Sequence, residues 1–179
     1  EDTRNFAIAF IRDELSGKLS ADAIIAICDS IRPEVQELGK ALLLDKFQSA
    51  DAGRYMVRLA EHPSTNLQLL VSTMLEHHVG TDLERLKSIR PYLVTVLSQV
   101  NRGRVAKQRV MNLLRREASR SAETAAILVP ILDRQSATIA VTQKYPMIAT
   151  MVDVHIAFPD VALPIAVTKP APAAKQGGA

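Results

Sequence analysis

Three arginines have the type and spacing that most clearly indicate a binding chemistry: Arg102, Arg109 and Arg116. They are seven positions apart, nearly two full turns of an α-helix, so a helix would align them in one row. The surrounding segment 102–120 holds seven Lys and Arg residues against Glu117 alone, a net charge of +6 in a chain whose total is +3. Because guanidinium groups pair well with carboxylates and phosphates, the row predicts an anion-facing surface.

Three interpretations of this basic segment remain open. It can be a solvated helix face with local ion pairs to Asp82, Glu84 or Glu123. It can bind an acidic protein or peptide, or it can bind the phosphate backbone of a nucleic acid. Aromatic residues for base stacking make up only 4% of the chain, and the neighbouring segments add few basic groups, which disfavours nucleic acid.

Catalytic and metal chemistry have little support in the residue pattern. His77 and His78 are adjacent, so on a helix their side chains point about 100° apart, and no His-x-x-x-His spacing occurs. The chain has no phosphate-binding glycine motif and no G-x-S-x-G motif. Its one cysteine, Cys28, lies in the apolar stretch AIIAICDS and is expected to be buried. We therefore predict a protein that is not an enzyme and holds no metal or cofactor.

The elements that must position these side chains are predicted to be helices. Apolar residues recur at positions i, i+3, i+4 and i+7 between turns. Ser20 and Ser121 precede acidic first turns and fit helix N-caps, while Pro33 and Pro63 fit the first position of a helix. The expected apolar faces are Phe6, Phe10 and Ile11; Val35, Leu38, Leu42 and Leu43; Leu67, Leu70, Val71, Met74 and Leu75; and Ala106, Val110, Leu113 and Leu114.

These helices follow one another as repeated pairs. The first apolar residues of the second helices are separated by 29, 32, 38 and 34 residues, and they are Phe6, Val35, Leu67, Val105 and Ile139. Each of the last four is preceded by another helical stretch, at 21–30, 52–62, 83–100 and 122–132. A two-helix unit repeated with a period in the thirties is typical of a helical solenoid.

The segment SIRPEVQELGKALL resembles the turn and second helix of a HEAT-type repeat, and DTRNFAIAFIRDEL resembles another second helix. The resemblance covers residues 1–152, and armadillo-like or other two-helix repeats would give a similar pattern. The third repeat departs from it, because 83–100 is long and contains Pro91, where we expect a break. The resemblance implies a scaffold or binding surface, since HEAT proteins share no catalytic residues.

The end of the chain has a different pattern. In VDVHIAF the apolar residues alternate, which fits an extended strap on the solenoid, the last turns of a helix, or a strand offered to a partner. The final TKPAPAAKQGGA is typical of a flexible tail. We predict an extended or disordered tail over 153–179. Charged residues and prolines interrupt the apolar stretch 146–167, so it is not expected to span a membrane.

The sequence therefore predicts an all-α, right-handed α-solenoid of four to five HEAT-like repeats over 1–152, followed by that tail. The predicted function is a non-catalytic cytoplasmic scaffold that binds a protein partner, as part of a longer chain or complex. The alternatives are nucleic-acid backbone binding through 102–120 and a non-catalytic subunit of an enzyme complex.

The first helix raises a further expectation. Phe6, Phe10, Ile11 and Leu15 are placed on one side of it, and a second helix without its partner exposes apolar surface. We expect the native chain to extend upstream, or this end to dock on another subunit. Alternatively, residues 1–3 cap a true first helix.

Overall fold

The computed structural model describes residues 2–46, 52–79, 82–99, 103–137 and 141–164. Within these ranges the chain forms ten α-helices and no strand, which confirms the all-α prediction. The chain divides into two compact units, Glu1–Arg116 and Glu117–Ala179.

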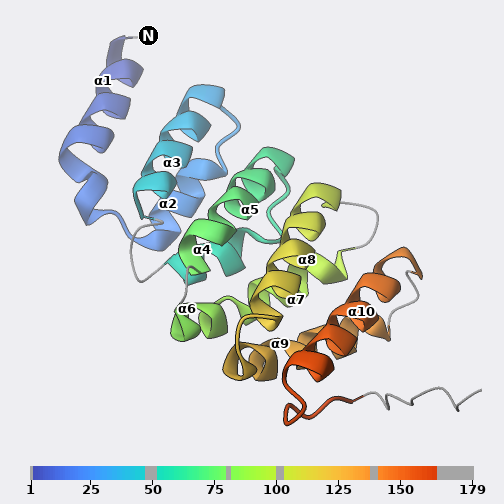
Figure 1. Ribbon diagram of the computed structural model, residues 1–179. Coiled ribbons are helices and arrows are strands. Elements are labelled where there is room, and N and C mark those ends of the chain that lie inside the picture. The colour runs from blue at the N-terminus through green and yellow to red at the C-terminus, as the bar shows by residue number, and fades with distance from the viewer. Residues whose placement is uncertain (1, 47–51, 80–81, 100–102, 138–140, 165–179) are drawn as a thin grey trace, which may run out of the picture. The chain divides into compact units, whose positions relative to one another are not determined.

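Unit 1 contains three long helices, α3, α5 and α8, with shorter helices between them. Its first helix, α1, continues through a π-helical turn at Ile11–Leu15 and a 3-10 turn at Ser16–Lys18. Helix α2 packs on α3 and α4 on α5, while both α2 and α7 also contact α4. In Figure 1, α1, α3, α5 and α8 follow one another across the unit. The bounds are α1 Asp2–Phe10, α2 Ala21–Cys28, α3 Pro33–Lys46, α4 Ala52–Leu59, α5 Thr65–Val79, α6 Leu83–Ser88, α7 Arg90–Ser98 and α8 Arg104–Ala118.

Local sequence signals account for several of these helix ends. The Ser20 hydroxyl accepts the N–H of Ala23 at 3.2 Å, and α3 begins at Pro33 as predicted. The break expected at Pro91 is also confirmed, because α6 ends at Ser88 and Pro91 lies in the first turn of α7. The prediction for Pro63 is wrong.

Helix α5 begins at Thr65 rather than at Pro63. The Ser64 hydroxyl accepts the N–H of Leu67 at 3.4 Å, which is the bond expected of a helix N-cap. The start of α5 is therefore determined by the Ser64 hydroxyl, which accepts a first-turn N–H, and not by the fixed φ of Pro63.

The core of unit 1 is mainly aliphatic and follows the predicted stripes. Ala106, Val110, Leu113 and Leu114 of α8 are all buried, as are Leu67, Val71 and Leu75 of α5 and Leu38, Leu42 and Leu43 of α3. The other members of the predicted faces, Val35, Leu70 and Met74, are half-buried. Helical apolar spacing therefore identified the centres of the covered faces, and these three positions lie at their edges.

Helices α2 and α3 cross closely at Gly39. A Cβ on Gly39 would lie 2.7 Å from the backbone nitrogen of Cys28, so a larger residue would force the helices apart. Cys28 is fully buried, as predicted, and burial raises the pKa of its thiol to about 11. The thiol therefore stays protonated at neutral pH and acts as a small apolar core group.

Unit 2 is built on α9, Ala122–Ser136, and α10, Val141–Ala157, which pack on each other. Leu128 and Leu132 of α9 are buried, as are Met147, Met151 and Val154 of α10. These positions are three or four residues apart, the spacing that keeps side chains on one helix face.

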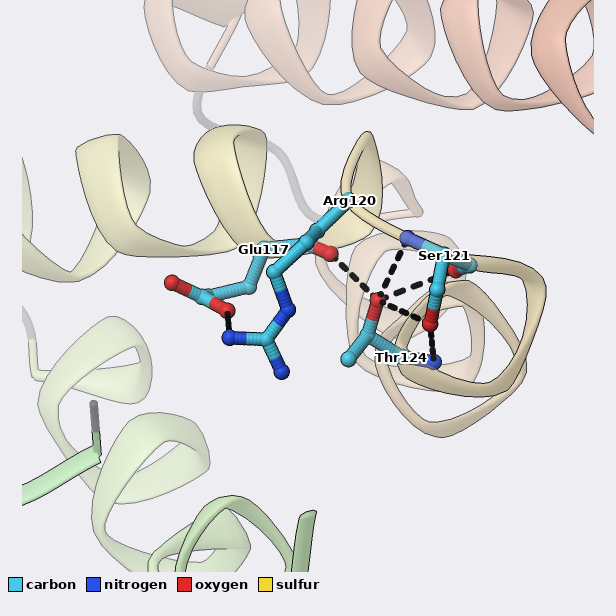
Figure 2. A network of polar contacts seen from close by, with 4 residues as sticks. All are labelled: Glu117, Arg120, Ser121 and Thr124. Atoms are coloured by element: carbon cyan, nitrogen blue, oxygen red, sulfur yellow. Dashed lines mark hydrogen bonds and ion pairs between the residues drawn. The ribbon is translucent and has the colours of Figure 1, made fainter. Parts of the chain in front are cut away.

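A polar network holds the start of α9 (Figure 2). Ser121 caps α9 as predicted, with its hydroxyl accepting the Thr124 N–H at 3.3 Å. The Thr124 hydroxyl donates to the Glu117 carbonyl oxygen at 2.6 Å and accepts the Ser121 N–H at 3.1 Å. The carboxylate of Glu117, a residue only 3% exposed, pairs with Arg120 at 2.6 Å. Residues 117–124 thus hold the turn that precedes α9 through contacts between positions up to seven residues apart.

The alternating pattern near the end of the chain is helical. Helix α10 continues to Ala157, so the prediction of an extended segment from 153 onward is wrong for 153–157. Val154 belongs to the buried stripe of α10, whereas Ile156 is 73% exposed. The buried residues of α10 keep helical spacing through Val154, although the apolar residues of VDVHIAF also alternate. Of the three alternatives for this segment, the last turns of a helix are observed. Residues 165–179 of the predicted tail lie outside the described residues.

None of the helices in the described ranges is long and apolar enough to cross a bilayer.

Candidate functional site

Arg109, the central member of the predicted arginine row, reaches from α8 to α5. Its Nη1 donates to the Ser72 hydroxyl at 2.5 Å and to the Leu69 carbonyl oxygen at 3.1 Å. Ser72 is fully buried, and its own hydroxyl donates to the same Leu69 carbonyl at 2.8 Å. Arg109 therefore links α8 to α5 through charge-assisted hydrogen bonds.

Tyr92 of α7 lies within the electrostatic reach of Arg109. The residue is 1% exposed, and burial strongly raises the pKa of its phenol, while the positive charge of Arg109 acts in the opposite direction. The phenol is therefore neutral at physiological pH. Helices α5, α7 and α8 thus place a buried hydroxyl, a buried phenol and a partly exposed guanidinium near one another in a mainly aliphatic unit.

The other two members of the row differ from Arg109. Arg116 is exposed on α8, whereas Arg109 is only partly exposed. Arg102 lies outside the described residues. The structure therefore places two of the three arginines on one helix, and the anion-facing role of the complete row stays a prediction.

The exposed arginines of α8 are spread over more than one side of the helix. Arg104, Arg115 and Arg116 are exposed, and so are Gln108 and Asn112, whose side chains are joined by a hydrogen bond of 3.0 Å. On a helical projection Arg104, Gln108, Asn112 and Arg115 fall on the side opposite the buried Val110–Leu114 stripe, whereas Arg116 lies beside that stripe, about 20° from Arg109. The outer side of α8 therefore carries two arginines, and Arg116 extends the positive charge toward Arg109.

The acids expected to pair with the basic segment make contacts on their own helices. Asp82 lies 3.5 Å from Arg85, and Glu84 lies 2.7 Å from Lys87. Glu123 accepts hydrogen bonds from its own backbone N–H and from the Ser121 side chain, which lower the pKa of its carboxyl. These contacts satisfy the three acids locally, at the starts of α6 and α9.

Helix α1 carries the surface that sequence reasoning located only in part. It has no buried residue, and Phe6 and Phe10 are 71% and 45% exposed. Their rings stack, with centroids 6.1 Å apart and an interplanar angle of 17°. Ile11 and Leu15 are half-buried instead, so the prediction that all four share one side is wrong.

The reason is the rotation between consecutive helix positions. Phe10 and Ile11 are adjacent, and one helical step turns about 100°. The π-helical turn at Ile11–Leu15 then changes the phase of the residues that follow. The angular separation was available from the sequence, whereas the π-helical turn was not.

Two histidines are buried in unit 1. His62 connects the start of α5 to the end of α2: its Nδ1 accepts the Ser64 N–H at 3.0 Å, and its Nε2 lies 3.0 Å from Asp29 Oδ1. His78 is 4% exposed, and burial, followed by the charge of Arg85, lowers its pKa. The side chain of His77 lies outside the described residues. Across the described ranges, no group of three His, Cys, Asp or Glu side chains is placed to hold a metal ion.

Comparisons with protein-family models, curated proteins and solved structures gave no match to this chain.

Proposed function

We propose that this chain is a non-catalytic helical-repeat scaffold whose exposed helix faces bind a protein partner. The observation that carries the proposal is α1, a helix with no buried residue and a stacked pair of exposed phenylalanines. Phenylalanine is enriched in protein interfaces, and exposed apolar clusters usually mark interaction sites. Membership in an enzyme complex, without chemistry of its own, is one form of this role.

The contacts between successive helix pairs support the repeat architecture. Arg58 of α4 pairs with Asp22 of α2. The Gln99 amide, just after α7, donates to the Ala60 carbonyl, just after α4, at 2.6 Å. Arg109 joins α8 to α5 in the same way. Each contact connects a helix to its counterpart in the next pair, as expected for a right-handed HEAT-like solenoid in which every repeat contacts its neighbours.

The basic side of α8 is the second surface in this proposal. The sequence predicts that Arg102, Arg109 and Arg116 form an anion-facing row. In the proposed complex, the exposed Arg116 makes direct contact with carboxylates, together with Arg104 and Arg115. Arg109 positions this surface by holding α8 against α5.

Nucleic acid is the second candidate partner, because α8 exposes three arginines, Arg104, Arg115 and Arg116. Phosphate binding needs only such a charge cluster. Binding of single strands also uses aromatic platforms, and Tyr55 and Tyr92 of unit 1 are 3% and 1% exposed. The exposed aromatic pair, Phe6 and Phe10, lies on α1 and not on the basic helix α8. Because the arginines of α8 have no exposed aromatic side chain on their own helix, we favour a protein partner.

Site-specific photo-crosslinking tests the proposal. A photoreactive phenylalanine analogue is placed at Phe6, at Arg116, or at the exposed control position Lys87, and each chain is irradiated in an extract of its native cells. Adducts are digested separately with protease and with nuclease. The partner is then purified and its affinity for the unmodified chain is measured.

The proposal expects protease-sensitive adducts at position 6 or 116, absent at 87, and direct binding by the purified partner. Nuclease-sensitive adducts at 116 alone would support the nucleic-acid candidate instead. Identical adducts at all three positions, or a purified protein that does not bind, would contradict a specific scaffold.

A further inference from the structure

A row of four exposed side chains runs along the outer side of α1 and its π-helical continuation. Its members are spaced by four residues, so each lies about one helical turn from the next. Two aromatic rings occupy the centre and a carboxylate lies at each end. The row is Asp2, Phe6, Phe10 and Glu14, which we call the α1 row.

The opposite side of α1 already has a neighbour. Ile8, Ile11 and Leu15 are half-buried, and Arg4 pairs with Glu34 of α3 at 3.7 Å. Helix α1 therefore has an inner apolar side that faces unit 1 and an outer apolar side that does not. Its outermost position in unit 1 is visible in Figure 1.

Charge decides what can cover the α1 row. If two copies of the chain paired through it, the phenylalanines would meet, but the carboxylates would meet as well. A parallel arrangement opposes Asp2 to Asp2, and an antiparallel one opposes Asp2 to Glu14. Like charges placed opposite each other weaken association, so the row disfavours a second copy. Cationic groups at both ends of the partner would complement it.

We propose that the α1 row binds an amphipathic helix of another protein that carries large apolar residues between basic residues. The basic groups would lie about 17 Å apart, close to the axial distance from Asp2 to Glu14. The apolar residues would cover Phe6 and Phe10, since helix-in-groove recognition uses anchors at i, i+3, i+4 and i+7. This inference rests on the proposed function, because it specifies one partner of the scaffold.

Three synthetic peptides test the chemistry of the partner. The first is a helical peptide with a central leucine stripe and Lys at both ends. The second replaces each Lys by Glu, and the third has the composition of the first in an order that gives no apolar stripe. Binding of the complete chain to each fluorescent peptide is followed by anisotropy. We expect the basic amphipathic peptide to bind at least about tenfold more tightly than either of the others.

Three double variants locate the binding surface. Phe6→Gln with Phe10→Gln should weaken binding of the basic peptide at least about tenfold, because the aromatic anchors are lost. Asp2→Asn with Glu14→Gln should weaken it about two- to tenfold and reduce its salt dependence, because exposed ion pairs are weak and screened. The matched control is Tyr145→Gln with Ile156→Gln on α10, which removes two exposed apolar side chains elsewhere and should leave binding unchanged. Far-UV circular dichroism checks that every variant remains helical.

Other outcomes would overturn the inference. Equal affinity for the basic and acidic peptides would remove the charge argument. Binding that survives the Phe6 and Phe10 changes would place the site elsewhere. A mass that grows with concentration and returns to monomer in the Phe6 and Phe10 variant would make a second copy the occupant. Failure of all three peptides would overturn this inference alone, since crosslinking at Arg116 tests the scaffold independently.

Discussion

Helices α1 and α8 both carry apolar residues at helical spacing, yet these residues have different surroundings. In α8, the stripe containing Val110, Leu113 and Leu114 is fully buried. In α1, no residue is buried and Phe6 is 71% exposed. Because helical spacing is present in both, spacing alone does not decide burial. A helix buries its apolar side only where neighbouring elements cover it.

The polar residues of the two helices follow the same rule. Arg109 of α8 donates two hydrogen bonds to α5, whereas Arg4 of α1 makes one exposed ion pair with α3. Exposed ion pairs contribute little to stability, whereas hydrogen bonds from charged groups to buried partners contribute more. The comparison predicts that α8 stabilises unit 1 and that α1 is available for binding.

The largest difference is expected from truncating one apolar side chain in each helix. Leu113→Ala should lower the free energy of unfolding by about 2–5 kcal/mol, because it leaves a cavity in the core. Phe6→Ala should change it by less than about 0.5 kcal/mol. Urea unfolding of both variants measures the difference. A similar loss in Phe6→Ala would mean that α1 is part of the core.

Replacing one arginine on each side of α8 distinguishes an arginine that holds α8 against α5 from an arginine that is exposed to solvent. Arg109→Met should lower the free energy of unfolding by about 1–3 kcal/mol, because its charged donor to Ser72 and Leu69 is lost. Arg104→Met, on the exposed side, is the matched control and should stay within about 0.5 kcal/mol.

A double-mutant cycle of Arg109→Met with Ser72→Ala sharpens this test. Direct contact predicts a coupling energy of about 0.5–3 kcal/mol, and additive effects would argue against the link between α5 and α8.

A pH titration tests the buried His78 of α5. Burial and Arg85 lower its pKa in the folded chain, while Asp82 acts weakly in the opposite direction. The unfolded chain takes up the proton near pH 6.5 and the folded chain only at lower pH. The contribution of neutral His78 to the free energy of unfolding is therefore present above about pH 6.5 and is lost on acidification.

One such group changes the free energy of unfolding by at most about 1.4 kcal/mol per pH unit. We expect the free energy of unfolding, measured at several pH values, to fall less on acidification for His78→Gln than for the wild type. The same pH dependence in both proteins would contradict a lowered pKa for His78.

The smallest effect is expected at a helix start. Ser121→Ala should lower the free energy of unfolding by about 1 kcal/mol, because the Thr124 N–H loses its acceptor. Thr3→Ala in the exposed first turn of α1 provides the comparison and should have almost no effect. Thermal unfolding monitored by circular dichroism measures the change in Tm of each variant. Equal changes in Tm for Ser121→Ala and Thr3→Ala would show that the Ser121 cap contributes no more than an exposed first-turn residue.

Much of the helical framework could be predicted because it depends on short-range interactions. The break at Pro91 follows from the geometry of proline, and the caps at Ser20 and Ser121 follow from hydroxyls that reach nearby N–H groups. The buried stripe of α8 follows from its spacing, because its residues share one side whatever covers them.

The candidate sites were less predictable. The sequence placed Arg109 in an anion-facing row with Arg102 and Arg116, but did not indicate that Arg109 hydrogen-bonds to Ser72 and Leu69, residues of a different helix. It also did not indicate the π-helical turn at Ile11–Leu15, which changes the phase of the residues that follow Ile11.

The sequence by itself determined that this chain is helical, where most helices begin, and which residues of α8 lie together. Only the tertiary structure decided that α8 is covered while the outer side of α1 is not, that Arg109 lies against α5, and that α10 continues to Ala157. Local propensity acts over one or two helical turns, whereas burial depends on segments tens of residues away. The same apolar periodicity therefore forms core in one helix and an exposed aromatic surface in another.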